Sequence, residues 1–229
     1  MSSFGGYSVA TFSFLEELAF NNNRGWFEAH RGDYETAVVE PSLALIADME
    51  PLIRSISPHF RAVAKKSGGS LMRIYRDTRF ARDKTPYKTN IGIQFRHELA
   101  ADVHTPAFYV HLATDECFIG AGTWHPEPSD LKKIRTYLSE HPDDYRSATA
   151  QAIEASGMSI SGEALKKAPR GFDPDHPLAT ELRRIDFLLS ADLEPTLYLE
   201  PGLVAKLERS FSGAAPYMRF LCEALEAPF

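Results

Sequence analysis

The chain has 229 residues, of which 44% are hydrophobic and 24% charged, and its formal net charge is −6. This composition is that of a folded globular protein and excludes intrinsic disorder, while the length suits one large domain or two small ones. No apolar run is long enough to cross a bilayer, so no membrane partner is expected. The acidic balance argues against a broad basic face for nucleic acid, although a small basic pocket stays compatible with one.

Two features favour a cytoplasmic location. The chain starts Met-Ser-Ser-Phe-Gly-Gly-Tyr, which lacks the charged and apolar regions of a secretory signal. Its only cysteines, Cys117 and Cys222, lie far apart among apolar residues. This placement favours buried thiols in a reducing compartment over a disulfide framework.

The first third of the chain is predicted to be helical. Apolar residues recur at helical spacing in 11–20, a segment that ends at Asn21, and again in 26–39. Pro41 suits the first turn of a third helix. Pro51 interrupts the apolar pattern of that helix, which predicts a kink or a break.

The middle of the chain changes to an alternation of period two, which predicts strands. The predicted strands are 71–75, 91–96, 107–112 and 116–120. The short separation between the last two predicts an antiparallel hairpin.

Helices return in the last part of the chain. The predicted elements are a helix from Ser129 as N-cap to Leu138, a helix over 143–155, a short helix over 178–184, a strand over 186–189 and a helix over 203–225. Gly213 and Pro216 are expected to divide the last helix. We therefore predict a single α+β domain over 1–229, with a mainly antiparallel sheet in the middle packed by N-terminal and C-terminal helices.

A basic stretch, 73–88, is the most distinctive feature of the sequence. It holds six lysines and arginines against Asp77 and Asp83, a balance of 6 − 2 = +4, so the rest of the chain sums to −6 − 4 = −10. Clustered charge of one sign attracts counter-charges, and guanidinium groups clamp phosphate or carboxylate groups bidentately. The residues expected to bind such an anion are Arg73, Arg76, Arg79, Arg82, Lys84, Tyr87 and Lys88.

The same stretch has a structural interpretation. Its arginines and aspartates alternate so closely that they can pair with one another, and exposed pairs of that kind contribute little. Arginine can also stack on nearby aromatic rings. The residues alone therefore leave both interpretations open.

The candidate acid–base residues are His111 and Asp83. His111 lies inside an apolar strand, on the face opposite Val110 and Leu112, and His125 at the exit of the sheet is a comparable candidate. Asp77 and Asp83 could ligate a divalent metal, but the surrounding arginines would neutralise them first. No metal and no cofactor are expected, because the sequence carries no zinc, dinucleotide or P-loop signature.

Four segments resemble one family when taken in order. They are 22–31, 73–88, 120–128 and 169–177. Together they are similar to the uncharacterised, mainly bacterial family called domain of unknown function 2461, over roughly 7–229. The resemblance implies a cytoplasmic single-domain α+β protein and no established activity.

The function expected from the sequence is the binding of a small phosphate- or carboxylate-bearing ligand at the Arg-rich loop, by an enzyme or by a simple binding protein. One alternative is a nucleic-acid-associated factor that grips a phosphate backbone through the same loop. Another is a non-enzymatic scaffold whose Arg/Asp network is paired internally. The sequence does not indicate the reaction or the oligomeric state.

Overall fold

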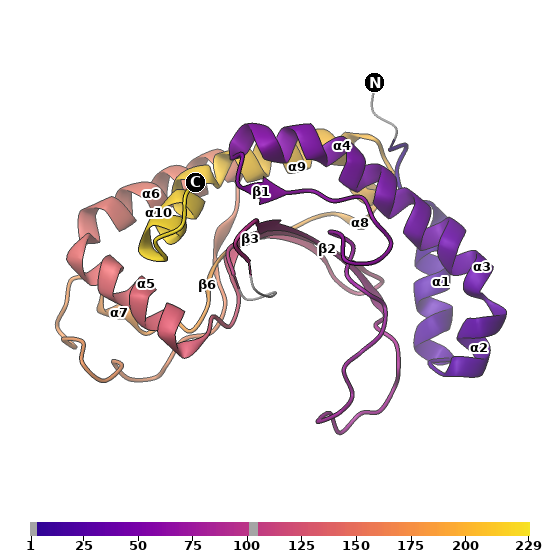
Figure 1. The fold of residues 1–229 in the computed structure, drawn as a ribbon, viewed down its shortest axis with the longest axis horizontal. Coiled ribbons are helices and arrows are strands. Elements are labelled where there is room, and N and C mark those ends of the chain that lie inside the picture. The colour runs from indigo at the N-terminus through magenta and orange to yellow at the C-terminus, as the bar shows by residue number, and fades with distance from the viewer. Residues whose placement is uncertain (1–3, 101–104) are drawn as a thin grey trace.

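An antiparallel sheet forms the middle of the fold in the computed structural model, which describes residues 4–100 and 105–229 (Figure 1). The order of its strands is β1-β2-β3-β4-β6-β5, and every neighbouring pair is antiparallel. The strands are β1 (Phe60–Arg61), β2 (Asn90–His97), β3 (Ala107–Ala113), β4 (Cys117–Thr123), β5 (Ser159–Ser161) and β6 (Phe187–Asp192). The predicted α+β class with its central antiparallel sheet is confirmed.

Helices precede β1 and follow β4 along the chain, and β5 and β6 lie among the helices of the C-terminal part. On the N-terminal side they are α1 (Val9–Phe20), α2 (Arg24–Ala29), α3 (Arg31–Tyr34), the π-helical η1 (Glu35–Val39) and α4 (Glu40–Ile56). On the C-terminal side they are α5 (Pro128–Glu140), α6 (Pro142–Ser156), α7 (Ala179–Leu182), α8 (Pro195–Tyr198), α9 (Gly202–Gly213) and α10 (Ala215–Ala224). Among the described residues, no helix has the length and apolar character needed to cross a membrane.

One face of the sheet is covered and the other is open. Figure 1 shows α4 and α9 lying across the covered face. There Phe211 of α9 packs against Phe108 of β3 and Phe95 of β2, with ring centroids 5.0 and 6.2 Å away. Burying one phenylalanine contributes about 2 kcal/mol, so these rings help to hold the helical layer on the sheet. The core therefore lies between the sheet and these helices.

Several local predictions were wrong. α4 continues through Pro51 without a break, because its buried apolar face keeps the helix against the core despite the missing backbone N–H. Ser129 is not the N-cap of α5, which begins at Pro128, a residue suited to the first helical position. The predicted helix over 26–39 is divided among α2, α3 and η1.

The predicted strand over 71–75 is reduced to two isolated bridges, Leu71 to Ile93 and Tyr75 to Tyr87. This segment and the one that leads into β2 form a ribbon that leaves the sheet and projects on its open side (Figure 1). We call residues 73–88 the basic hairpin. The predicted division of the C-terminal helix is confirmed, since α9 ends at Gly213 and α10 starts at Ala215.

Candidate functional site

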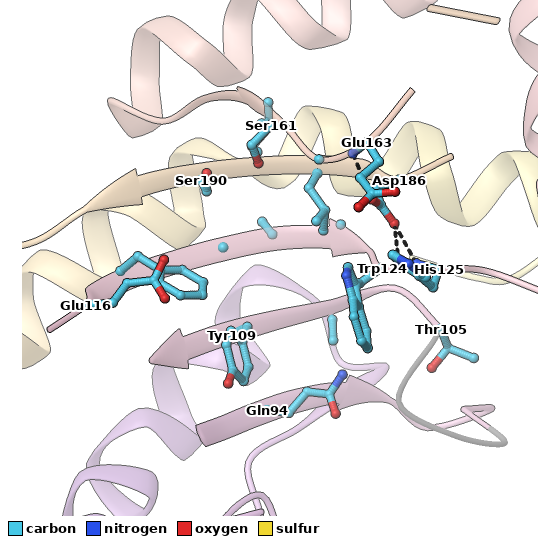
Figure 2. Close-up of a pocket in the computed structure, with 18 of the residues that line it drawn as sticks. Gln94, Thr105, Tyr109, Glu116, Trp124, His125, Ser161, Glu163, Asp186 and Ser190 are labelled. Carbon is cyan, nitrogen blue, oxygen red and sulfur yellow. Dashed lines mark hydrogen bonds and ion pairs between the residues drawn. The ribbon is translucent and has the colours of Figure 1, made fainter. Parts of the chain in front are cut away.

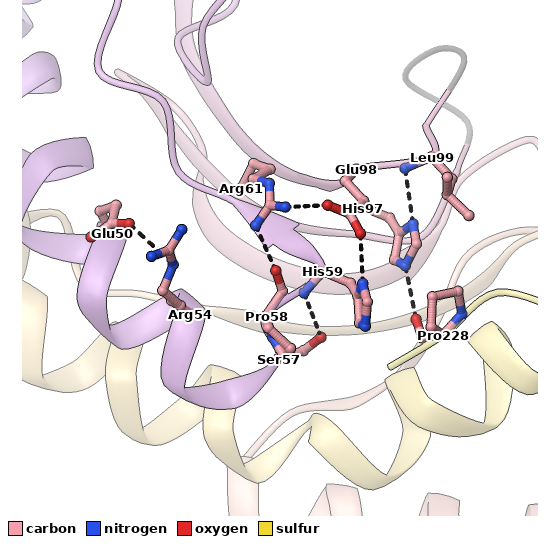
Figure 3. Close-up of polar contacts among 10 residues, drawn as sticks. All are labelled: Glu50, Arg54, Ser57, Pro58, His59, Arg61, His97, Glu98, Leu99 and Pro228. Carbon is pink, nitrogen blue, oxygen red and sulfur yellow. Dashed lines mark hydrogen bonds and ion pairs between the residues drawn. The ribbon is translucent and has the colours of Figure 1, made fainter.

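A cavity of about 550 Å³ lies on the open face of the sheet (Figure 2). We call it the open-face cavity. Its volume falls in the range of roughly 300–1,000 Å³ that is typical of sites for small organic ligands. Side chains from β2, β3, β4, β5 and β6 line it, so a rigid sheet forms its floor.

The cavity exists because several strand positions on this face carry no side chain. Gly120 and Gly122 of β4 line the cavity, and a bulkier residue at Gly120 would fill part of it. Gly92 of β2 lies on the same face, next to the lining residue Tyr109. A Cβ atom at Gly92 would come within 2.8 Å of the Tyr109 hydroxyl and 2.9 Å of the Met72 sulfur. Tyr109 therefore occupies the space that the missing side chain leaves.

A histidine and an aspartate meet at one end of the cavity. Thr123 at the end of β4 pairs with Phe187 at the start of β6, so the residues just outside these strands lie together. Asp186 is only 1% exposed, and its Oδ1 accepts hydrogen bonds from the backbone N–H of His125 (2.7 Å) and from Nδ1 of the same residue (2.8 Å). Its Oδ2 accepts from the backbone N–H of Glu163 (2.9 Å).

These contacts assign the tautomer of His125. A carboxylate only accepts hydrogen bonds, so Nδ1 of His125 carries a proton and donates it to Asp186. Nε2 has no hydrogen-bond partner among the described residues, and the side chain is 44% exposed. The imidazole is thus oriented by a buried anion and keeps one nitrogen available.

The backbone at His125 has a strained conformation, and the hydrogen bonds from His125 to Asp186 hold it there. His125 has a φ of 48°, which is uncommon for a residue other than glycine and is found often at functional sites. Asp186 holds both the main chain and the ring of His125 in this conformation. On the other side of Asp186, Gly162 has a φ of 91°, and a Cβ atom there would lie 2.5 Å from the Asp186 Cβ.

The arrangement can transfer protons. A histidine held through Nδ1 by a buried carboxylate can accept a proton at Nε2, because the carboxylate stabilises the imidazolium that forms. Ser161 and Ser190 line the same cavity, but neither makes a hydrogen bond to His125. Within the described residues, no group of three or more His, Cys, Asp or Glu side chains is arranged to hold a metal ion.

The basic hairpin forms a second, shallower depression of about 430 Å³. Its lining includes Arg73, Arg76 and Arg79. Two of these guanidinium groups are already bonded to carboxylates of the hairpin. Arg76 donates to Asp83 Oδ2 (2.5 Å), and Arg79 Nη2 donates to Asp77 Oδ2 (2.6 Å).

The other predicted anion-binding residues have different surroundings. Lys84 Nζ donates to the Thr78 carbonyl at 2.8 Å. Tyr87 lies in the core, where its ring stacks on Phe27 at a centroid distance of 4.2 Å. Arg82 is exposed and makes no ion pair with a described residue.

Arg73 and Lys88 are two further cations of the hairpin and, like Arg82, are not paired with its carboxylates. Neither is in an ion pair with a described residue, and the two sit on opposite limbs of the hairpin. Partial burial lowers the pKa of Lys88, and the nearby charge of Arg73 lowers it further. Two cations thus lie close enough to repel each other.

The two predicted catalytic residues do not meet. His111 of β3 is hydrogen-bonded through Nδ1 to the Tyr109 hydroxyl (3.0 Å), and its ring stacks on Phe118 at 4.6 Å. Burial lowers the pKa of His111. Asp83 lies on the hairpin, where the Thr85 backbone N–H and then the Arg76 side chain lower its pKa to about 2. A catalytic role for either residue stays a prediction.

Comparison with known families adds one finding. The family model described as conserved hypothetical protein (DUF2461) matches residues 10–220. The chain belongs to this family. No curated protein matches the sequence. Both the open-face cavity and the basic hairpin lie inside the matched span, and the family's description names no activity.

In this DUF2461 protein, sequence reasoning considered His125 but missed its partner Asp186. The two residues are 61 positions apart, and although His125 belongs to the 120–128 segment, no motif connects it with Asp186. The available signal was weak: Asp186 begins the predicted strand 186–189, and His125 follows the predicted strand 116–120 at the exit of the sheet. Only the β4–β6 pairing makes them neighbours.

Proposed function

We propose that the protein binds a small organic molecule in the open-face cavity and moves a proton to or from it through Nε2 of His125. The observation that carries this proposal is the grip of buried Asp186 on both the backbone and the Nδ1 of His125. General acid–base catalysis by a positioned side chain contributes about 10²–10⁴-fold to a rate. Asp186 acts as a positioning residue, because it reaches the ligand only through His125.

The binding part of the proposal is tested with a variant that fills the cavity. Gly120 has an ordinary backbone conformation, and an added Cβ would meet only the Leu189 carbonyl at 3.5 Å, so Gly120→Val should fold. A thermal-shift screen against small metabolites should find compounds that stabilise the native chain. A compound at about 100 times its dissociation constant adds about 2.7 kcal/mol of stability. Gly120→Val should lose this stabilisation.

Gly5→Val is the matched control, because Gly5 has open space around it and lies outside the cavity. It should keep the response of the native chain. For a compound that is also converted, His125→Gln should keep binding and lose turnover. Equal stabilisation of Gly120→Val and the native chain would contradict the proposed cavity, and full turnover in His125→Gln would contradict the proton transfer.

A second candidate function is supported by Arg73 and Lys88. Their mutual repulsion would be relieved by a phosphate or carboxylate placed between the limbs of the basic hairpin. Calorimetry with pyrophosphate should show a larger loss of affinity in Arg73→Ala than in Arg79→Ala, since Arg79 is already bonded to Asp77. Unchanged affinity in Arg73→Ala would reject this site. Oligonucleotide binding that weakens steeply with salt would instead support the nucleic-acid alternative.

We also propose a cytoplasmic location. Cys117 and Cys222 are both free and buried, which suits a reducing compartment.

A further inference from the structure

The charged side chains that line the open-face cavity are almost all of one sign. The acidic side chains in the lining are Glu116, Glu163, Asp186 and Asp192. No lysine or arginine is among the described residues that line it. Arg96 of β2 pairs with Ala107, a lining residue, but is not itself part of the lining.

The carboxylates are distributed along the cavity. Glu163 and Asp186 lie with His125 at one end, and Glu116 lies at the other (Figure 2). Asp192 belongs with Glu116, because it pairs with Phe118 near the start of β4. A cleft lined by one sign of charge between apolar walls concentrates the field and enriches ions of the opposite sign.

The walls between these ends are aromatic. Trp124 is 52% exposed, and Figure 2 shows it between His125 and Gln94, with Tyr109 further along the cavity. Phe118 completes this wall. The face of an aromatic ring, above all that of tryptophan, attracts an organic cation.

From these observations we propose that the open-face cavity selects a small organic cation, an amine or a guanidine with an apolar body. This inference rests on the proposed function and specifies its ligand. The cationic group lies against the accessible carboxylates, whereas buried Asp186 acts on it only through His125. The apolar body lies on the aromatic wall and over the strand glycines. An ammonium group also donates a hydrogen bond to Nε2 of His125, the nitrogen that Asp186 leaves available. An anionic ligand would instead be repelled by the acidic side chains of this cavity.

The test uses the two tryptophans of the full chain as reporters in ¹H–¹⁵N NMR spectra. Trp124 lines the cavity, whereas Trp26 of α2 stacks on His30 at 4.1 Å and serves as an internal control. The probes are benzylammonium, benzyl alcohol and benzoate, which share a ring and differ in charge. Benzylammonium should shift the Trp124 indole signal saturably and leave the Trp26 signal in place. Its affinity should exceed that of benzyl alcohol about tenfold, and benzoate should bind most weakly, because close charges in a cleft act through a reduced dielectric.

Three variants test whether the carboxylates of the cavity cause the preference for benzylammonium over benzyl alcohol. Glu163→Gln and Asp192→Asn should each lower the preference for benzylammonium over benzyl alcohol several-fold, one at each end of the cavity. Glu16→Gln changes the net charge equally on an exposed position of α1 and should leave the preference intact. Added salt should reduce the preference in the native chain.

The outcomes separate the two levels of the proposal. Equal affinities for the three probes, or a preference for benzoate, would overturn the cationic ligand and leave the cavity as a binding site. A Trp124 signal that none of the probes moves would overturn the inference together with the proposed function. A charge preference that Glu163→Gln and Asp192→Asn leave unchanged would also overturn it, since the cavity carboxylates would not be its source.

Discussion

The open-face cavity and the basic hairpin both place a carboxylate against basic groups, but they do so in different surroundings. Asp186 is buried, and its two oxygens accept three hydrogen bonds from His125 and Glu163. The hairpin carboxylates, Asp77 and Asp83, have side chains that are 44% and 60% exposed. Exposed pairs contribute little because water and salt screen them, whereas a buried carboxylate keeps its donors in place.

Because of this difference, the region with the highest density of charge is not the region whose polar groups are free to contact a ligand. The hairpin has the higher density of cations in the sequence, yet Arg76 and Arg79 bind carboxylates within the hairpin. At the cavity, one histidine nitrogen faces no protein partner among the described residues. The less conspicuous region therefore has the histidine nitrogen that the proposed proton transfer uses.

The largest effect is expected from removing the Asp186 carboxylate. In Asp186→Ala, the three N–H donors that it binds lose their acceptor, and two of them come from His125. The free energy of unfolding should fall by about 3 kcal/mol, as expected when a charged acceptor is removed from buried donors. Urea denaturation monitored by circular dichroism measures this loss.

Asp186→Asn is the control, since it keeps the shape of the side chain and one acceptor oxygen. It should lose less stability than Asp186→Ala. A loss below about 1 kcal/mol in Asp186→Ala would mean that water replaces the carboxylate, and the contrast with the hairpin would then fail.

A smaller effect is expected at Gly162. Alanine there must adopt a positive φ and must also displace the Asp186 Cβ, which would lie 2.5 Å away. Gly171 has nearly the same φ, 92°, with open space around it, so Gly171→Ala isolates the backbone cost. We expect a loss of about 1 kcal/mol for Gly171→Ala and about 3 kcal/mol for Gly162→Ala, measured by thermal unfolding. Equal losses would show that the loop yields easily around Asp186.

The smallest effects are expected at the hairpin, where they appear in titration. The pKa of Asp77 and that of Asp83 both lie at about 2, below their ordinary value of 3.8. Because these values are lowered on folding, any stability they contribute is present above about pH 4 and is lost as the pH falls through about 2. Carboxyl NMR should show both groups still ionised at pH 3.

Two variants sharpen this comparison. The Arg79 side chain is the largest cause of the low pKa of Asp77, so Arg79→Ala should return that pKa most of the way to its ordinary value. The largest cause for Asp83 is the Thr85 backbone N–H, which Arg76→Ala leaves in place, so its pKa should rise only in part. Each variant serves as the control for the other. A change at both carboxylates in either variant would indicate one coupled network.

The elements with strong periodicity could be predicted from the sequence. The sequences of β2, β3 and β4 carry the alternation of period two that is typical of strands, and the division at Gly213 follows from local backbone chemistry. β1 and β5 are too short to show a period. β1 forms because it pairs with the edge of the longer strand β2, and β5 forms because it pairs with the edge of β6.

The errors have a common cause. From local hydrogen bonding alone, Pro51 is expected to end a helix. α4 nevertheless continues, because its apolar face is buried against the core. The 71–75 segment alternates as a strand should, yet only Leu71 and Tyr75 form bridges. In both places, tertiary packing outweighs a local preference.

The sequence by itself determined the fold class, most of the longer helices and strands, and the family, because these depend on periodicity and on contiguous motifs. It also identified the basic hairpin, whose charges are neighbours along the chain. Only the tertiary structure decided that Arg76 and Arg79 are paired, that Tyr87 is in the core and that His125 meets Asp186. The physical reason is that a cavity and its electrostatics arise from residues brought together by strand pairing, and the order of the chain does not record which strands will pair.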